Sequence, residues 1–308
     1  MPVCINMERI DICCIGHITL DKVVTTRSAV FMAGGTAFYF SNALSRMGVR
    51  YRLVTAVASD GMAAVSNLRL AGVNVIALPS AHTVYFENIY GENQDHRTQR
   101  VLRTADPFPA AAFGGVDARI FHLGPLLAGD IPLEVIRTLA EKGKISLDAQ
   151  GYLRQVLDQQ VTPVDWPEKR AALKYVSILK TNESEMAVLT EQPDIRQGAK
   201  ILAEWGVKEV VITLGSQGSV IYMDQRFYDI PAYVPTTSVV DATGCGDTYM
   251  AGYLYQRSKG IPVQGAGEFA AAMATLKIEA SGPFTGTEDD VLGLLASRQG
   301  TQGTVYVS

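Results

Sequence analysis

Short apolar runs alternate with segments of helical period along most of the chain. The apolar runs predict strands at residues 9–16, 51–57, 73–78, 119–123, 144–149, 175–179 and 209–214. The helical periods predict helices at residues 36–47, 61–71, 131–142 and 195–205. Strands that alternate with helices are typical of right-handed βαβ units. The sequence therefore predicts an α/β fold, a three-layer α/β/α sandwich around a mostly parallel central sheet.

Two stretches, residues 19–32 and 84–103, alternate in strand fashion with no helix between their strands. The second contains a polar segment, residues 91–97, that suits a hairpin turn. Both stretches could be ordinary surface hairpins, or they could form a small antiparallel flap, or lid, over one edge of the main sheet. We expect an α/β core of residues 1–18, 34–83 and 104–308, with residues 19–33 and 84–103 inserted as a β lid.

The composition of the 308 residues excludes several classes of protein. Hydrophobic residues make up 47% and charged residues 19%, which predicts a folded chain with a large core rather than a disordered one. The 27 basic and 31 acidic residues give a net charge of −4 without a basic run, so we expect no nucleic-acid partner. No apolar run approaches the roughly 18 residues of a membrane span, and no signal peptide is evident. We therefore expect no membrane partner.

The four cysteines, Cys4, Cys13, Cys14 and Cys245, lack the spacing of metal ligands. Cys13 and Cys14 stand in an apolar run that predicts a buried strand. Free thiols in a core indicate a reducing compartment, so we expect a cytoplasmic protein.

The strongest local signal is residues 239–248, Val-Val-Asp-Ala-Thr-Gly-Cys-Gly-Asp-Thr. An apolar strand end runs into a glycine-containing turn and then into a helical period. Glycines at a helix start let backbone N–H groups converge on an anion. Asp247 beside such an anion would repel it unless the carboxylate takes a proton from an attacking hydroxyl, as phosphoryl transfer requires. The alternative is a glycine-rich turn with an aspartate that caps the helix.

Three weaker signals accompany it. Asn182 and Glu185 directly follow a strand, and their spacing fits a capping box or a site beside a hydrated Mg²⁺. The segment 213–218, Thr-Leu-Gly-Ser-Gln-Gly, ends another strand and allows a tight hairpin or close approach of a nucleotide. Gly34 and Gly35 open a helix, either as a connector or for close approach of a substrate. The third glycine of a dinucleotide fingerprint is missing, which disfavours a dehydrogenase.

In this order, these motifs resemble the ribokinase-like (PfkB) family of carbohydrate kinases, from Gly16 to about Pro283. The segment 16–21, Gly-His-Ile-Thr-Leu-Asp, looks like the opening strand with the substrate aspartate. Gly34-Gly35, with Ala43, Leu44, Arg46 and Gly48, is similar to the first family signature. Residues 241–248 resemble the second signature, which is the more specific of the two.

The resemblance implies an ATP-dependent kinase with Mg²⁺ as cofactor. Asp247 would be the catalytic base, and the N–H groups of Gly244, Cys245 and Gly246 would stabilise the transferring phosphoryl group. Asn182 and Glu185 would hold Mg²⁺ through water, and Asp241 with Thr243 would bind K⁺, as in family members that potassium activates. The nucleotide site would be lined by Thr213, Gly215, Gly218, Asn182 and Gly282, with the helix 270–278 beside the adenine. Asp21, Gly34 and Gly35 would bind acceptor hydroxyls.

The acceptor is indicated by departures from the ribokinase pattern. Thr19 and Tyr39 stand where ribokinases carry asparagines, whose amides both donate and accept hydrogen bonds, so ribose is disfavoured. The segments 34–41, 99–101 and 148–154 look like the inositol-kinase branch, with Tyr39 and Arg154 as further substrate-binding residues. We therefore expect a sugar or cyclitol kinase, with myo-inositol as the first candidate. A nucleoside kinase and a catalytically silent nucleotide or metabolite sensor are the alternatives, and the lid edges of two copies could pair in a homodimer.

Overall fold

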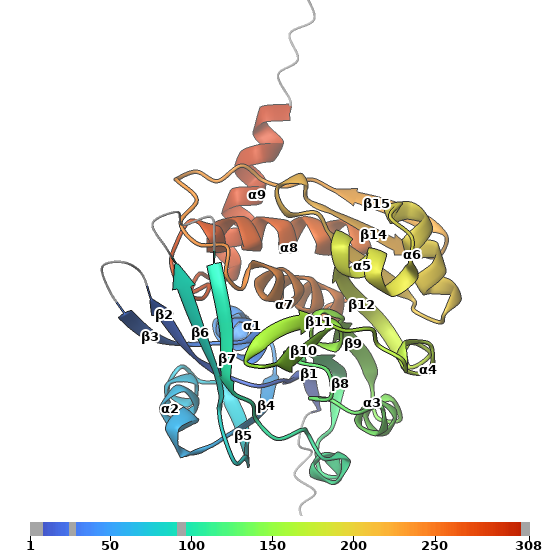
Figure 1. Cartoon of the computed structure of the whole chain (residues 1–308). Coiled ribbons are helices and arrows are strands. Elements are labelled where there is room, and N and C mark those ends of the chain that lie inside the picture. The colour runs from blue at the N-terminus through green and yellow to red at the C-terminus, as the bar shows by residue number, and fades with distance from the viewer. Residues whose placement is uncertain (1–8, 25–28, 91–96, 303–308) are drawn as a thin grey trace, which may run out of the picture.

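The computed structural model of the chain describes residues 9–24, 29–90 and 97–302. Cys4 and residues 91–96 of the predicted polar turn lie outside these ranges. Two sheets and the helices around them make up the fold (Figure 1). The larger sheet has nine strands in the order β15-β14-β13-β12-β9-β8-β1-β4-β5.

Seven strands of the larger sheet run parallel. They are β1 (Ile10–Ile15), β4 (Tyr51–Val57), β5 (Asn74–Pro79), β8 (Ala118–Leu123), β9 (Lys144–Asp148), β12 (Val176–Asn182) and β13 (Glu209–Thr213). Two antiparallel strands, β14 (Ser219–Met223) and β15 (Arg226–Ile230), extend the sheet beyond β13. The mostly parallel sheet predicted from the sequence is confirmed.

Helices cover both faces of this sheet, and β1 explains how. Its side chains alternate, so Ile12 and Cys14 enter one core while Cys13 and Ile15 enter the other. The first core is closed by α1 (Thr36–Leu44), α2 (Met62–Leu70), α7 (Cys245–Ser258), α8 (Val263–Ile278) and α9 (Glu288–Gln302). The second is closed by α3 (Leu133–Ala140), α4 (Lys169–Leu173), α5 (Glu183–Thr190) and α6 (Ile195–Glu204). This arrangement confirms the three-layer sandwich.

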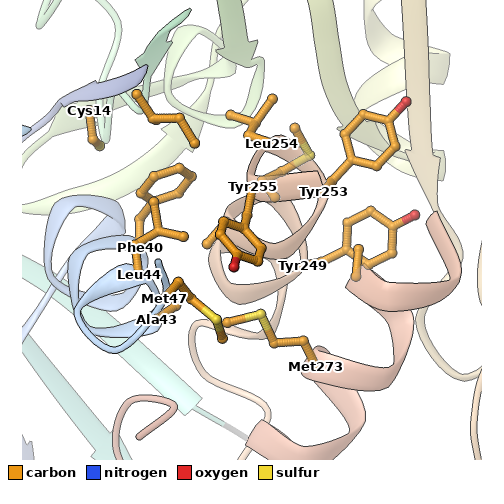
Figure 2. Close-up of a cluster of buried hydrophobic side chains, with 14 of the residues drawn as sticks. Cys14, Phe40, Ala43, Leu44, Met47, Tyr249, Tyr253, Leu254, Tyr255 and Met273 are labelled. Atoms are coloured by element: carbon orange, nitrogen blue, oxygen red, sulfur yellow. The ribbon is translucent and has the colours of Figure 1, made fainter. Parts of the chain in front are cut away.

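The first core fixes α7, the helix that follows the strongest sequence motif. Figure 2 shows Phe40 and Leu44 of α1 beside Leu254 and Tyr255 of α7, with Met273 of α8 in the same cluster. Phe40, Tyr253 and Tyr255 are fully buried. Because α1 and α8 both pack against α7, the core fixes the position of this helix.

The smaller sheet has six strands in the order β10-β11-β7-β6-β2-β3. It contains β2 (Thr19–Val24), β3 (Ala29–Gly34), β6 (Val84–Tyr90) and β7 (Arg97–Arg103), as the sequence predicted for the lid. It is mostly antiparallel, although β2 and β6 run parallel. A small apolar cluster of Val84, Phe86, Val101, Leu126 and Leu127 packs beneath it.

Two sequence predictions need correction. The smaller sheet also includes β10 (Arg154–Leu157) and β11 (Gln160–Pro163), which lie in the range predicted for the core. The side chains of these two strands are exposed or half-buried, so no apolar run in the sequence predicts them. Two helices begin directly after a proline: α3 starts after Pro132 rather than at the predicted residue 131, and α8, implied by the resemblance over residues 270–278, already starts after Pro262.

Candidate active site

The start of α7 is built around Gly244. This residue is the N-cap with φ of 74°, a left-handed conformation that favours glycine. A Cβ atom at this position would lie 2.2 Å from the ring of Tyr39. Both observations show why the turn needs glycine here: the backbone is left-handed, and the α1 aromatic ring lies directly against it.

The backbone N–H groups of this turn differ in whether they donate a hydrogen bond within the protein. Cys245 N–H donates to the carbonyl oxygen of Ala242 at 3.2 Å. Within the described ranges, the N–H groups of Gly244 and Gly246 donate to no protein acceptor. The first N–H groups of a helix have no partner in the helix itself and carry partial positive charge, so they can bind an anion. Two of the three N–H groups predicted for this role are thus available.

Asp247 lies in the first turn of α7, where its side chain accepts a hydrogen bond from the side chain of Thr36. Burial of the carboxyl, together with the negative charge of Asp148, raises the pKa of Asp247 to about 6. The ammonium of Lys180, the Thr36 hydrogen bond and the guanidinium of Arg154 act in the opposite direction. A carboxylate with a pKa near 6 is a stronger base than an exposed aspartate and is still mostly ionised at neutral pH.

The charges beside Asp247 belong to a buried ion pair. Lys180 Nζ lies 2.9 Å from Asp148 Oδ2, and both residues are almost fully buried. They are register partners on the neighbouring strands β12 and β9. Lys180 also reaches the α7 turn, because a Cβ atom on Gly246 would lie 3.3 Å from its Nζ. The ammonium therefore lies next to the anion-binding turn.

Asn182 and Glu185 form a reciprocal capping box at the start of α5. Glu185 N–H donates to Asn182 Oδ1 at 2.8 Å, and Asn182 N–H donates to Glu185 Oε2 at 2.9 Å. Gln150 Nε2 donates to the other oxygen, Glu185 Oε1, at 3.2 Å. The capping box that the spacing allowed is thus present, and it holds the Glu185 carboxylate at the end of β12.

This carboxylate fits the binding of a hydrated Mg²⁺. Each carboxylate oxygen has more than one lone pair, so hydrogen bonds from the protein leave room for water, and Mg²⁺ keeps several of its waters. Among the residues that the structure describes, no cluster of three or more His, Cys, Asp or Glu side chains could hold a metal directly. The residues therefore fit a water-mediated site.

The predicted acceptor residues meet where β2 and β3 pair. Thr19 Oγ1 donates to Asp21 Oδ1 at 2.6 Å. A Cβ atom on Gly34 would lie 2.4 Å from Asp21 Oδ2, and one on Gly35, where φ is 84°, would lie 2.6 Å from the carbonyl oxygen of His17. Gly34 thus allows the chain to pass close to Asp21, and Gly35 allows it to pass close to the backbone of His17.

Tyr39 is only 3% exposed, and its ring packs on Gly244. Burial, and then the negative charges of Asp241, Asp21 and Asp247, raise the pKa of the Tyr39 hydroxyl. Tyr39 therefore lies between the predicted acceptor residues and the α7 turn. One face of its ring is covered by α7 at Gly244. Phe38, half-buried and edge-on to Tyr39, is the more exposed ring.

Arg154 begins β10 in the smaller sheet, and its charge lowers the pKa of Asp247. The structure thus brings this predicted residue into electrostatic range of Asp247.

The residues predicted for the nucleotide lie at the ends of β12 and β13. Thr213 Oγ1 donates to the carbonyl oxygen of Thr181 at 3.4 Å. A Cβ atom on Gly215 would meet no other atom within 4 Å, so the surroundings of this residue are open. Gly218 serves the hairpin to β14, because a Cβ atom there would lie 2.1 Å from the carbonyl oxygen of Ile230. Gly282 is the exception: it follows α8, and its N–H lies beside the Asp241 carboxylate and lowers the pKa of that group.

Asp241 and Thr243, predicted to bind K⁺, are also adjacent. Thr243 N–H donates to Asp241 Oδ1 at 2.9 Å. Lys277 of α8 donates to the carbonyl oxygen of Asp241 at 2.7 Å, and its Nζ lies 3.4 Å from Asp241 Oδ2. Burial raises the pKa of Asp241, but hydrogen bonds from Thr243 and the charge of Lys277 lower it overall.

Three charged residues of the site were given no role from the sequence: Asp148, Lys180 and Lys277. Each is buried, at 4%, 6% and 1% exposure. A signal was present, because Lys180 and Lys277 stand inside apolar runs, Ile-Leu-Lys-Thr and Thr-Leu-Lys-Ile. A charge in such a run requires a buried partner. Which partner it finds depends on pairing between distant segments.

Known proteins match this chain over most of its length. The model of the pfkB family carbohydrate kinases matches residues 9–290. A cytidine kinase of Thermococcus kodakarensis is 28% identical over 269 residues, which cover 83% of this chain and 91% of that protein.

Solved structures of kinases also match the chain over most of its length. A pyrophosphate-dependent kinase in the ribokinase family, complexed with a pyrophosphate analog and myo-inositol, superposes with a TM-score of 0.80 at 28% identity. The match covers 92% of this chain and 99% of that one. Ribokinase of Arabidopsis thaliana, complexed with ribose and ATP, shares the fold with a TM-score of 0.78 at 22% identity, over 93% and 99% of the two chains. In the described ranges, no helix has the length and apolar character needed to span a membrane.

Proposed function

The chain belongs to the pfkB family of carbohydrate kinases, phosphotransferases with a hydroxyl acceptor, and from this premise we propose that it phosphorylates a small polyol, with myo-inositol as the first candidate. The observation that carries the proposal is the position of Asp247. A carboxyl with a pKa of about 6 lies in the first turn of a helix, beside the N–H groups of Gly244 and Gly246, which donate to no acceptor among the described residues. This pairing of a base with an anion site is what transfer to a hydroxyl needs.

In the proposed reaction, the acceptor hydroxyl attacks the terminal phosphoryl group of the donor. A new O–P bond forms, the bond from phosphorus to the leaving oxygen breaks, and the hydroxyl proton passes to Asp247. The N–H groups of Gly244 and Gly246 and the ammonium of Lys180 stabilise the negative charge on the phosphoryl oxygens. Asn182 and Glu185 would hold Mg²⁺ through water, and the ion would neutralise charge on the donor phosphates.

The acceptor side supports a polyol. Asp21 and Thr19 offer a carboxylate and a hydroxyl, and Gly34 and Gly35 offer a close backbone approach. The ring of Tyr39 is covered by α7, so this residue offers no stacking face to a nucleobase. The structural similarity to a kinase complexed with myo-inositol points the same way.

A nucleoside is the second candidate acceptor. It is favoured by the similarity to the Thermococcus cytidine kinase over most of both chains. The half-buried ring of Phe38 is the aromatic group nearest to Tyr39 that a nucleobase could stack upon.

We propose ATP as the donor. The open surroundings of Gly215 beside the end of β13 support a nucleotide there. Pyrophosphate is the second candidate, since the similar kinase with myo-inositol depends on pyrophosphate.

We also propose that two copies pair through β3. This strand ends the smaller sheet, and it exposes Val30 at 53% and Phe31 at 68%. An edge strand with exposed apolar side chains can pair with the same strand of a second copy.

The test combines ATP or pyrophosphate with Mg²⁺ and a panel of inositols, hexoses, pentoses and nucleosides, and follows product phosphate by ³¹P NMR. We expect myo-inositol to give the highest kcat/KM, with ATP as the better donor. A nucleoside with the highest value would replace the polyol assignment. No turnover with any acceptor, in a protein that still binds ATP, would contradict the enzyme assignment and favour a sensor.

A further inference from the structure

Lys277 holds a charged ammonium inside the first core. It stands in the last turn of α8, and its side chain has no exposed surface. The ammonium has three N–H donors. It donates to the carbonyl oxygen of Asp241 at 2.7 Å, lies 3.4 Å from Asp241 Oδ2, and lies 5.9 Å from the centre of the Tyr39 ring.

A buried ammonium lowers stability unless its charge is compensated. Here the carboxylate of Asp241 and the face of the Tyr39 ring provide the compensation. Keeping such a group in the core is costly compared with an apolar side chain of the same size. The location of the charge therefore calls for a reason other than packing.

The charge lies at the base of the catalytic turn. The carbonyl oxygen of Ile278, at the end of α8, accepts the N–H groups of Val240 and Asp241 at 2.8 and 3.3 Å. Asp241 in turn accepts the N–H of Thr243, the residue before Gly244. Lys277 thus holds the segment from which the anion-binding N–H groups of α7 project.

A potassium ion does not fit the oxygens of Asp241 in this arrangement. Potassium binds carbonyl and carboxylate oxygens in place of its hydration shell. The Asp241 carbonyl already accepts from the Lys277 ammonium. Its carboxylate accepts from Thr243, lies beside the N–H of Gly282 and faces the same ammonium. A second cation there would also be repelled by the first.

We propose that the Lys277 ammonium takes the place of a monovalent cation at Asp241, so that this enzyme orders its catalytic turn without potassium. The proposal rests on the proposed kinase function. Lys277 is a positioning residue in this scheme, since it acts on the transferred group through Asp241 and the start of α7.

The first test compares the wild-type protein in KCl, NaCl and choline chloride at equal ionic strength. We expect the melting temperature to be the same in the three salts, because no site gains potassium on folding. We expect kcat to differ by less than about twofold. A melting temperature that rises specifically with potassium, or a kcat that rises about tenfold with it, would overturn the proposal. The melting arm needs no acceptor, so it is informative even if the proposed function is wrong.

The second test replaces the ammonium. In Lys277→Ala, we expect kcat to fall about 100-fold, with KM for the acceptor little changed. Potassium or methylammonium should restore part of kcat and raise the melting temperature of this variant alone. Lys277→Met fills the space with an apolar chain, so it should lose kcat without rescue by cations.

Lys142→Ala is the matched control. Lys142 also donates to backbone carbonyl groups, those of Phe113, Gly114 and Val116, but it lies beside α3 and away from the site. This variant should lose stability without any cation-dependent recovery of kcat. If Lys277→Ala folds and cations fail to restore it, the ammonium is only structural and the proposal is wrong. If it does not fold, the wild-type comparison decides.

Discussion

The Nζ atom of Lys180 lies 2.9 Å from Oδ2 of Asp148, and the two buried charges act on Asp247 with opposite sign. Asp148 raises the pKa of the Asp247 carboxyl, and Lys180 lowers it. The pair is therefore more than a link between β9 and β12. After burial, its two charges are the largest influences on the pKa of the proposed base.

This relationship predicts opposite shifts of the pH profile in two variants. The acid limb of kcat in the wild-type protein should lie near the Asp247 pKa of about 6, with activity rising as the pH rises through it. Asp148→Asn removes a negative charge and should move the limb down by about one pH unit, whereas Lys180→Met should move it up by a similar amount. The measurement is kcat against pH at saturating substrate.

Removing one partner of a buried pair also costs about 3–5 kcal/mol of stability, so both variants need a melting control. The double variant Asp148→Asn/Lys180→Met removes both charges and should be more stable than Lys180→Met alone. An acid limb that stays in place in both folded single variants would exclude Asp247 as the group that controls it.

Asp247→Asn should separate catalysis from stability. We expect turnover to fall by more than tenfold, with nucleotide binding retained, because the amide cannot take the hydroxyl proton. The folded pKa of about 6 lies above the usual aspartate pKa of 3.8, so the ionised carboxylate opposes folding. The stability present below the unfolded pKa is lost as the pH rises through about 6, by at most about 3 kcal/mol.

The amide of the Asp247→Asn variant stays neutral, so the stability of this variant does not fall as the pH rises through about 6. Asp247→Asn should therefore melt at a higher temperature than the wild type near pH 8, with little difference near pH 4. A variant that melts lower at both pH values would show that the carboxylate is not strained by burial. Retention of more than about a tenth of the wild-type rate would remove Asp247 from the role of base.

The sequence was sufficient for the parts of the site that depend on local backbone chemistry. The glycines of the α7 turn and the capping spacing of Asn182 and Glu185 are short-range patterns, and the structure has both. The apolar run that contains Cys13 and Cys14 likewise predicted a buried strand, and both thiols are fully buried. In each case the neighbours in sequence are also the neighbours in space.

The parts that could not be predicted depend on pairing between distant segments. Lys180 meets Asp148 because β12 lies beside β9 in matching register, and no local pattern fixes that neighbour. Lys277 meets Asp241 because α8 ends where the turn before α7 begins. The strands β10 and β11 join the smaller sheet through a single register pair with β7, which leaves no trace in hydrophobic periodicity.

Glu185→Gln should test the proposed metal role without breaking the capping box. Glutamine can accept the Asn182 N–H in the same box, so stability should change little. The loss of charge should raise the Mg²⁺ concentration needed for half-maximal rate by about tenfold. Asp194→Ala, which removes the side-chain N-cap of α6, is the matched control, since it should lose about 1 kcal/mol of stability without changing the Mg²⁺ requirement. An unchanged Mg²⁺ requirement in Glu185→Gln would leave this carboxylate with a structural role only.

Phe31→Lys should disrupt the proposed pairing of β3 edges. A lysine on an edge strand adds charge where two copies would meet, and it keeps the strand solvated. We expect sedimentation velocity to show a dimer for the wild type at micromolar concentration and a monomer for the variant. Leu157→Lys, on β10 at the opposite edge of the same sheet, is the control, because Leu157 is exposed to a similar degree. A wild-type protein that sediments only as a monomer would contradict the proposal.

The glycines of the α7 turn should differ in their tolerance of a methyl group. Gly244→Ala forces a side chain into a left-handed backbone, which costs about 1–2 kcal/mol, and places its Cβ 2.2 Å from the Tyr39 ring. Either Tyr39 or the turn must move. A shift of the turn changes the direction of its backbone N–H groups, so kcat should fall about 100-fold or more. Gly246→Ala meets only the flexible end of Lys180 at 3.3 Å and keeps its N–H, so it should retain most of kcat. Steady-state kinetics and melting curves for both variants check this contrast. Equal losses in the two variants would mean that the turn tolerates no side chain at all, and that the contact between Gly244 and Tyr39 does not set its geometry.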